Sequence, residues 1–127
     1  MQYSIDKQEE YTILTLQIDK LDSTQSPALK SELITLNSSG TPSLIINLSY
    51  VKYIDSSGLS ALLVGNRLFE ETSGSFILTN INPMVEKLLT ISQLINVLDI
   101  VPTDHEAIER VHMNELERRL KEEGGDE

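Results

Sequence analysis

The sequence predicts an α/β domain in which helices pack on a mixed sheet. Apolar runs typical of strands alternate with helical patterns after residue 19, and this order is typical of a sheet with helices connecting its strands. Two further strand-like segments precede residue 19 and lie close enough in sequence to form a hairpin. The chain has 127 residues, which is enough for one core and too few for two.

The hairpin is predicted from alternating hydrophobicity. Tyr3 and Ile5 alternate with polar neighbours, and residues 11–18 are rich in β-branched and aromatic side chains with apolar residues spaced by two. The charged stretch 7–10 between them has the composition of a turn. These segments therefore predict the first two strands.

A helix is predicted next. Its N-cap is either Ser26, which directly precedes Pro27, or Thr24, because hydroxyl side chains cap helices and proline suits the first turn. Leucines then recur at helical spacing, and we expect the helix to end near Asn37.

The remaining elements follow the same alternation. Residues 44–48 form a nearly continuous apolar run, as in a strand buried on both faces. The later elements, in chain order, are a strand over 50–54, an apolar helix that Gly74 ends, a strand over 75–79, a helix from Pro83, a strand over 97–101, and a helix over about 104–122 that opens with the capping box Thr103–Glu106. Residues 124–127 are predicted to fray.

Composition restricts the function. There are 20 acidic and 10 basic residues, and the net charge of −10 disfavours binding to nucleic acid or to anionic membranes. There is no cysteine, which removes disulfides and thiol chemistry. Apolar runs are too short for a membrane helix, and the N-terminus lacks a signal-peptide pattern, so we expect a soluble, cytoplasmic protein. Residues 101–127 carry half of the net charge and form either a solvated appendage or a partner surface.

The most informative segment is Asp55-Ser56-Ser57-Gly58-Leu59, between a predicted strand and a predicted helix. The first N–H groups of a helix lack internal partners and carry the positive end of its dipole, so a phosphate is well received there. Gly58 leaves room for an approaching group. A phosphate on Ser57 would add a charge of about −2 beside Asp55, which would switch a docking surface.

Other interpretations of these polar residues remain open. Asp55 and its serines are also ordinary helix caps, with no function beyond that. Asp22 and Asp55 resemble an acid pair for catalysis, but no histidine or lysine accompanies them in the motif, so we predict no catalytic residue and no enzyme activity. His105 and His112 lie two turns apart and, with Glu109, imitate a metal site; we interpret them as a solvated helix face and predict no metal and no cofactor.

The segment over 55–63 resembles the signature of STAS domains and, more narrowly, that of the bacterial anti-sigma factor antagonists. Leu21-Asp22 resembles the family's Leu-Asp after the second strand, and residues 82–89 resemble its later helix. The resemblance covers residues 1 to about 112. It implies a STAS-like mixed sheet of four to five strands with about four helices packed on it, formed by a domain over 1–112, with a charged helical extension and tail over 113–127.

The resemblance also implies a function. In the antagonists, the second serine of the motif is phosphorylated by a serine kinase that doubles as an anti-sigma factor. The unphosphorylated antagonist binds this kinase and releases the sigma factor, and a metal-dependent serine phosphatase resets the switch. Carried over, Ser57 is the phosphoacceptor. The partner surface would comprise Asp22, Asp55, Ser56, Ser57, Gly58 and Leu59.

Two alternatives use the same fold. The first is a constitutive STAS adaptor subunit of a lipid-transport ATPase or of a stress-sensing complex, in which the serine motif is retained without phosphorylation. The second is a serine-nucleophile or nucleotide-hydrolysing enzyme, for which the sequence offers no base, metal constellation or phosphate-binding loop.

Overall fold

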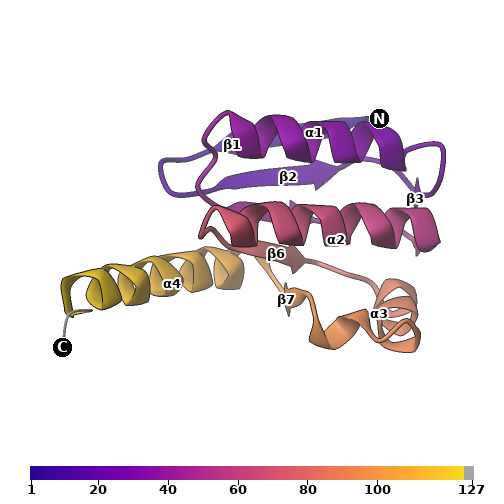
Figure 1. Ribbon diagram of the computed structural model, residues 1–127. Coiled ribbons are helices and arrows are strands. Elements are labelled where there is room, and N and C mark those ends of the chain that lie inside the picture. The colour runs from indigo at the N-terminus through magenta and orange to yellow at the C-terminus, as the bar shows by residue number, and fades with distance from the viewer. Residues whose placement is uncertain (125–127) are drawn as a thin grey trace.

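The computed structural model describes residues 1–124 and contains the predicted α/β fold (Figure 1). The elements in chain order are β1 (Tyr3–Lys7), β2 (Thr12–Leu16), β3 (Lys20–Leu21), α1 (Ser26–Ser38), β4 (Leu44–Asn47), β5 (Tyr53–Ile54), α2 (Ser56–Glu71), β6 (Phe76–Thr79), α3 (Pro83–Ile91), the 3-10 turn η1 (Leu94–Asn96), β7 (Asp99–Val101) and α4 (Asp104–Gly124). Gly124, which was predicted to fray, is instead the last residue of α4, and residues 125–127 of the predicted frayed tail lie outside the described residues.

The main sheet has five strands in the order β1-β2-β4-β6-β7. The predicted hairpin is confirmed, since β1 runs antiparallel to β2 with Tyr3 opposite Leu16. The other neighbours are parallel, which makes the sheet mixed. Strand β4 lies between two others and all three residues of its Leu44–Ile46 stretch are fully buried, as its continuous apolar sequence predicted.

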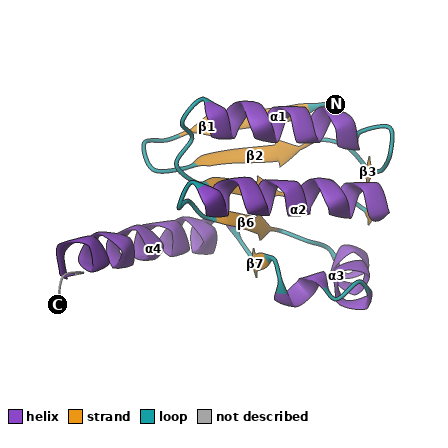
Figure 2. Cartoon of the chain, viewed as in Figure 1, coloured by secondary structure: helices purple, strands orange, loops and turns teal. Residues whose placement is uncertain are grey.

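Helices cover both faces of this sheet (Figures 1 and 2). Helices α1 and α2 lie side by side on one face, where leucines from both helices and Phe69 form the larger cluster of buried residues. Val85 and Leu89 of α3 join that cluster. Helix α4 covers part of the opposite face, where Ala107 and Val111 pack on the sheet in a second, smaller cluster.

A second, two-stranded sheet joins β3 and β5 in parallel, with Lys20 opposite Tyr53 and Leu21 opposite Ile54. The inner residue of each pair, Leu21 and Ile54, is buried, whereas Lys20 and Tyr53 are exposed. Because β3 leads into α1 and β5 leads into α2, this short ribbon brings the starts of the two helices together.

Several predicted boundaries were wrong. The N-cap of α1 is Gln25, which makes no side-chain capping bond. The predicted cap Ser26 is instead the first helical residue, and its hydroxyl is used elsewhere. Helix α2 ends at Glu71, before the predicted Gly74, and β7 begins at Asp99, two residues later than predicted.

Candidate functional site

The serine motif lies where β5 turns into α2. Asp55 has an extended backbone, with φ −98° and ψ −175°, and caps the helix because its side chain accepts a hydrogen bond from the Gly58 N–H at 3.0 Å. The sequence folds this way locally because an aspartate beside a helix start satisfies an N–H group that has no partner within the helix. The cap places Ser56 and Ser57 in the first turn.

The Ser57 hydroxyl is held by two contacts. It donates to Asp55 Oδ1 at 2.6 Å, and its oxygen lies 3.2 Å from the hydroxyl oxygen of Ser26. Ser57 is half-buried, whereas Ser26 is 2% exposed. Ser57 therefore lies at the boundary between core and solvent, beside the buried Ser26.

Gly58 allows α2 to start directly against the β3–β5 ribbon. A Cβ atom at this position would overlap the carbonyl oxygen of Leu21 and would lie 2.7 Å from Ile54 Cγ2. The glycine is thus required by the close approach of the helix start to the ribbon, and its role in leaving room for an approaching group stays a prediction.

The loop between β3 and α1 completes the site. Asp22 accepts two hydrogen bonds through Oδ1, from the Thr24 N–H at 3.0 Å and from the Thr24 hydroxyl at 2.5 Å. The Ser23 N–H donates to Asp55 Oδ2 at 3.2 Å. The structure therefore brings the loop that holds Asp22 against the start of α2, which joins segments more than 30 residues apart.

Both carboxylates of the site are stabilised in their ionised form. The hydrogen bond from Ser57, followed by that from the Gly58 N–H, lowers the pKa of Asp55 below its ordinary value. The Thr24 hydroxyl, followed by its N–H, lowers the pKa of Asp22, although the neighbouring Asp55 charge acts in the opposite direction. Such carboxylates hold protons poorly at neutral pH, which disfavours general acid catalysis by this pair.

The predicted site residues differ in their exposure. Ser56 is exposed, and Asp22, Asp55 and Ser57 are half-buried, so all four present atoms to solvent. Gly58 is buried, and the half-buried Leu59 packs against the larger core cluster. These last two residues thus shape the site from beneath.

Sequence reasoning missed three members of the hydrogen-bond network: Ser23, Thr24 and Ser26. Ser26 and Thr24 were considered only as caps of α1. Their role in the network depends on which segments the ribbon brings together, and the local sequence carries no signal of that.

The two histidines lie apart from this site. His105 contacts Glu109 at 2.9 Å, and His112 contacts Glu10 of the hairpin at 2.7 Å. Over residues 1–124 no group of three or more His, Asp or Glu side chains is arranged to hold a metal ion. The His112–Glu10 pair instead links α4 to the hairpin beneath it.

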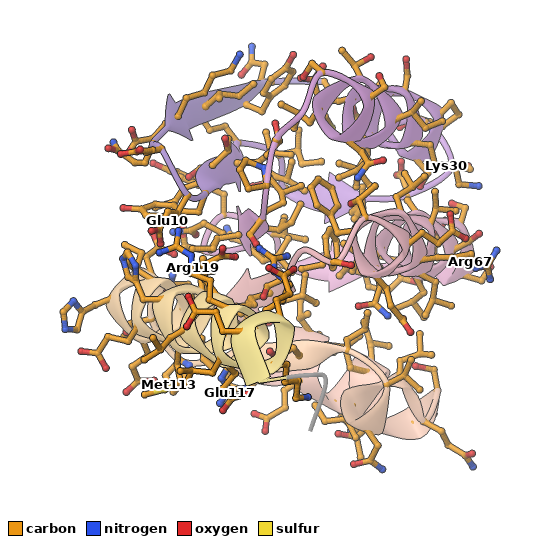
Figure 3. All side chains as sticks on the ribbon, turned by 60° about the vertical axis from the view of Figure 1, so that its left-hand side comes forward. Glu10, Lys30, Arg67, Met113, Glu117 and Arg119 are labelled. Carbon is orange, nitrogen blue, oxygen red and sulfur yellow. The ribbon has the colours of Figure 1, made fainter. Side chains whose placement is uncertain are left out.

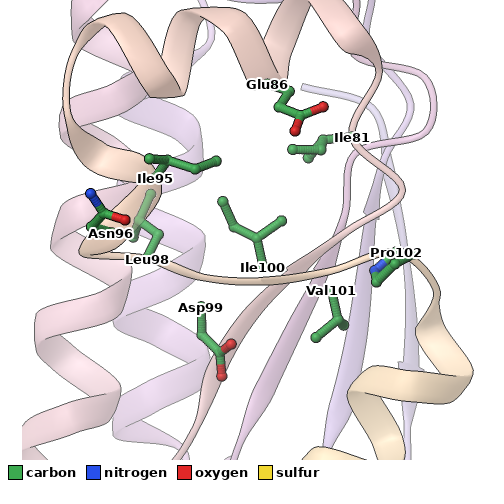
Figure 4. Close-up of a pocket in the computed structure, with 9 residues that line it drawn as sticks. All are labelled: Ile81, Glu86, Ile95, Asn96, Leu98, Asp99, Ile100, Val101 and Pro102. Atoms are coloured by element: carbon green, nitrogen blue, oxygen red, sulfur yellow. The ribbon is translucent and has the colours of Figure 1, made fainter.

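A groove of about 640 Å³ lies beside β7 and α3. Figure 4 shows Ile100 pointing into it, with Glu86 and Ile81 on one side and Ile95 on the other. Asp99 points the other way, toward α4, where it pairs with Arg110. The lining holds no serine, histidine or lysine, and its ionisable side chains are the carboxylates of Glu86 and Asp99.

No helix within residues 1–124 combines the length and the apolar character needed to cross a bilayer.

Known proteins are similar to this chain over most of its length. The family model described as STAS domain matches residues 2–107. An anti-sigma factor antagonist from Mycobacterium paratuberculosis has 20% sequence identity and a TM-score of 0.78, covering 87% of this chain and 93% of that chain. The phosphorylated form of the Bacillus cell fate determinant SpoIIAA has 26% identity and a TM-score of 0.66, covering 87% of this chain and 99% of that chain.

A further similar structure is a serine-to-glutamate variant of RsbS from Moorella thermoacetica. It has 22% identity and a TM-score of 0.75, covering 93% of this chain and 99% of that chain. Together with the family match, these structures confirm the predicted fold and the predicted similarity to anti-sigma factor antagonists.

Proposed function

Because the chain belongs to the STAS domain family, whose model matches residues 2–107, we propose that it is an anti-sigma factor antagonist switched by phosphorylation of Ser57. In its unphosphorylated form it binds a serine kinase that acts as an anti-sigma factor, and the sigma factor is released. The observation that carries this proposal is the half-buried Ser57 at the start of α2, whose hydroxyl is hydrogen-bonded to Asp55.

Ser57 acts as a substrate in this proposal and the chain itself is not an enzyme. The kinase transfers the γ-phosphoryl group of ATP to Ser57 Oγ: an O–P bond forms, the bond to the leaving ADP breaks, and the hydroxyl hydrogen leaves as a proton. The hydrogen bond from Ser57 to Asp55 is lost at that moment. A metal-dependent serine phosphatase hydrolyses the phosphoserine and restores the hydroxyl.

The switch follows from the charges beside Ser57. A phosphoserine carries a charge of about −1.5 to −2 at neutral pH, and Asp55 and Asp22 already provide two carboxylates whose pKa values lie below the ordinary value. A partner that fits the neutral hydroxyl must then accommodate a concentrated negative charge. Exposed Ser56 belongs to the same surface, so the kinase should contact both the helix start and the Asp22 loop.

The experiment compares substitutions at the two neighbouring serines. Ser57→Ala should keep binding to the kinase-type anti-sigma factor and abolish phosphorylation, whereas Ser57→Asp should weaken binding by at least about tenfold, or about 1.4 kcal/mol. Ser56→Ala, a matched control on an exposed side chain, should leave phosphorylation intact. Peptide mass spectrometry locates the phosphate, and calorimetry measures the affinity.

Incorporation of phosphate at Ser56 with none at Ser57 would contradict the proposal. So would equal affinity of Ser57→Asp and the parent for the kinase. Binding that is indifferent to Ser57 substitution would instead favour the constitutive adaptor, whose main partner would be a transport ATPase or a stress-sensing assembly. Because the kinase and the sigma factor of the proposed switch act in the cytoplasm, we also propose a cytoplasmic location for this protein.

A further inference from the structure

The hydroxyl of Ser26 is the buried group that contacts the phosphoacceptor. Ser26 is 2% exposed at the start of α1, and its Oγ lies 3.2 Å from Ser57 Oγ. It also donates to the backbone carbonyl of Asp22 at 2.7 Å. A hydroxyl at a helix start needs no partner on another helix, so this contact has no explanation in the fold of α1 alone.

The two hydroxyl groups make more contacts than they have hydrogens. Each carries one hydrogen and can accept two hydrogen bonds, and the three contacts are Ser26 to the Asp22 carbonyl, Ser57 to Asp55, and Ser26 to Ser57. The contacts at 2.7 and 2.6 Å take the two hydrogens. In the unmodified protein, no hydrogen therefore remains for the longer contact between the two hydroxyl oxygens.

A phosphoryl group on Ser57 changes this balance. It removes the hydrogen that Ser57 gives to Asp55 and adds three acceptor oxygens on the phosphorus bonded to Ser57 Oγ. Asp55 is a carboxylate and repels these oxygens, whereas Ser26 carries a hydrogen that it can redirect. We infer that the Ser26 hydroxyl is a positioning group of the modification site, which turns from the Asp22 carbonyl to a phosphoryl oxygen when Ser57 is phosphorylated.

This rotation leaves the start of α1 intact. The Asp22 carbonyl also accepts hydrogen bonds from the Gln25 N–H at 3.0 Å and from the Ser26 N–H at 2.9 Å. It thus stays paired when the Ser26 hydroxyl leaves, and no buried carbonyl is orphaned. The phosphoryl group gains a charge-assisted hydrogen bond, which is stronger than the neutral bond it replaces.

Ser26 and Asp55 therefore act on the phosphoryl group in opposite directions. Asp55 repels it from the helix cap, and Ser26 attracts it toward α1, so the modified side chain takes one fixed orientation on the surface. The inference rests on the proposed function, since it needs phosphate at Ser57. Its test, however, needs no kinase.

The test uses the full chain with phosphoserine incorporated at position 57 during translation, and measures the second pKa of the phosphate by ³¹P NMR titration. A hydrogen bond from Ser26 stabilises the dianionic phosphate and so lowers its second pKa. Ser26→Ala should therefore raise this pKa by about 0.5–1 unit relative to the parent. The charged groups on the neighbouring elements are Asp22 and Asp55 beside the serines, Asp19, Lys20 and Lys52 at the β3–β5 ribbon, Lys30 and Glu32 on α1, and Arg67, Glu70 and Glu71 on α2. They are identical in both proteins.

Ser23→Ala is the matched control, because Ser23 is exposed and contacts Asp55 only through its backbone N–H; it should leave the phosphate pKa unchanged. Ser26→Thr keeps a hydroxyl and should restore the parental value, and Ser26→Gly, which also lacks the hydroxyl, should repeat the rise. Circular dichroism checks that each variant folds.

Equal phosphate pKa values in the parent, Ser26→Ala and Ser26→Gly would overturn the inference, as would an equal rise in Ser23→Ala. Failure of every kinase to phosphorylate the natural chain would overturn the proposed function alone, because the titration is made on phosphoserine introduced by translation. The two failures are therefore distinguishable.

Discussion

Gly58 determines how closely the phosphoacceptor turn approaches the core. A Cβ at this position would overlap the Leu21 carbonyl oxygen, which belongs to the backbone of β3 and cannot rotate away, and would also press on Ile54. Gly58→Ala should therefore lower the free energy of unfolding by about 1–3 kcal/mol or more, as measured by urea denaturation.

Gly124→Ala is the control for that substitution, because nothing lies within 4 Å of its added Cβ. It should leave stability unchanged within about 0.5 kcal/mol. Equal effects of the two alanines would show that the Ser57 turn does not need its close contact with β3.

The Asp55 cap makes stability depend on pH. The hydrogen bonds from Ser57 and from the Gly58 N–H lower the pKa of Asp55 in the folded chain, so between the folded and unfolded pKa values the unfolded chain binds more protons. The stabilisation is present above the unfolded pKa and is lost as the pH falls through the folded pKa. Asp55→Asn should therefore show a flatter decline of the urea midpoint between pH about 5 and about 2.

The prediction would be wrong if the urea midpoints of the parent and of Asp55→Asn declined identically with falling pH, with the parent more stable by a constant amount. Ser57→Ala is a second test, because it removes the hydrogen bond that lowers the Asp55 pKa most while keeping the carboxylate. Its decline should lie between those of the parent and Asp55→Asn.

Site residues could be predicted from the sequence where their partners are near in sequence. Asp55 caps a helix that starts one residue later, and the motif with Ser57 and Gly58 is contiguous. The contact between Ser57 and Ser26 spans 31 residues and depends on the ribbon between β3 and β5. No local pattern at Ser26 distinguishes this use from an ordinary cap.

At the scale of elements, the segments with a strong apolar pattern were predictable, whereas the two-residue β3 and its pairing were not. Helix α2 has a long apolar pattern at helical spacing, and β4 has a continuous apolar run that is typical of a strand buried on both faces. Strand β3 has two residues and was not predicted, and β5 has two residues at the end of the strand predicted over 50–54. Two residues are too few for a period-two pattern, and no sequence pattern indicates that β3 and β5 pair with each other. The start predicted for β7 at Val97 is too early because the N–H groups of Val97 and Leu98 both donate to the Leu94 carbonyl of the preceding turn η1.

Helix α4 has two unlike faces, and this predicts unequal effects along it. Val111 is 2% exposed and packs on the sheet, whereas Leu116 is 52% exposed; Figure 3 shows Met113 and Glu117 pointing away from the sheet. Val111→Ala should lower the free energy of unfolding by about 1–2 kcal/mol. Leu116→Ala should change it by less than about 0.5 kcal/mol, because it removes little buried surface.

Urea denaturation of the two variants tests this contrast within one helix. If Leu116→Ala were as destabilising as Val111→Ala, the outer side of α4 would be buried in solution, and sedimentation would then show an assembly larger than one chain. Equal, negligible effects would show that α4 is not docked on the sheet.

At the scale of the whole molecule, the acidic excess opposes folding. The 20 acidic and 10 basic residues give a net charge of −10, and residues 101–127 carry nine of the acids. Described ion pairs are few and lie mainly on α4, for example Arg119 with Glu115 at 3.2 Å. Most carboxylates thus repel one another across the surface, and the compact chain holds them closer together than the unfolded chain does.

Added salt should therefore stabilise this protein at neutral pH. Raising the ionic strength from about 0.01 M to about 0.3 M shortens the screening length several-fold, which weakens the repulsion more in the folded chain than in the unfolded one. We expect the thermal midpoint to rise by about 2–5 °C, as measured by calorimetry. Near the isoelectric point of about 4.5 the net charge vanishes, so the same salt increase should give little or no rise. A midpoint that falls with salt at neutral pH would mean that the few ion pairs outweigh the excess of carboxylates.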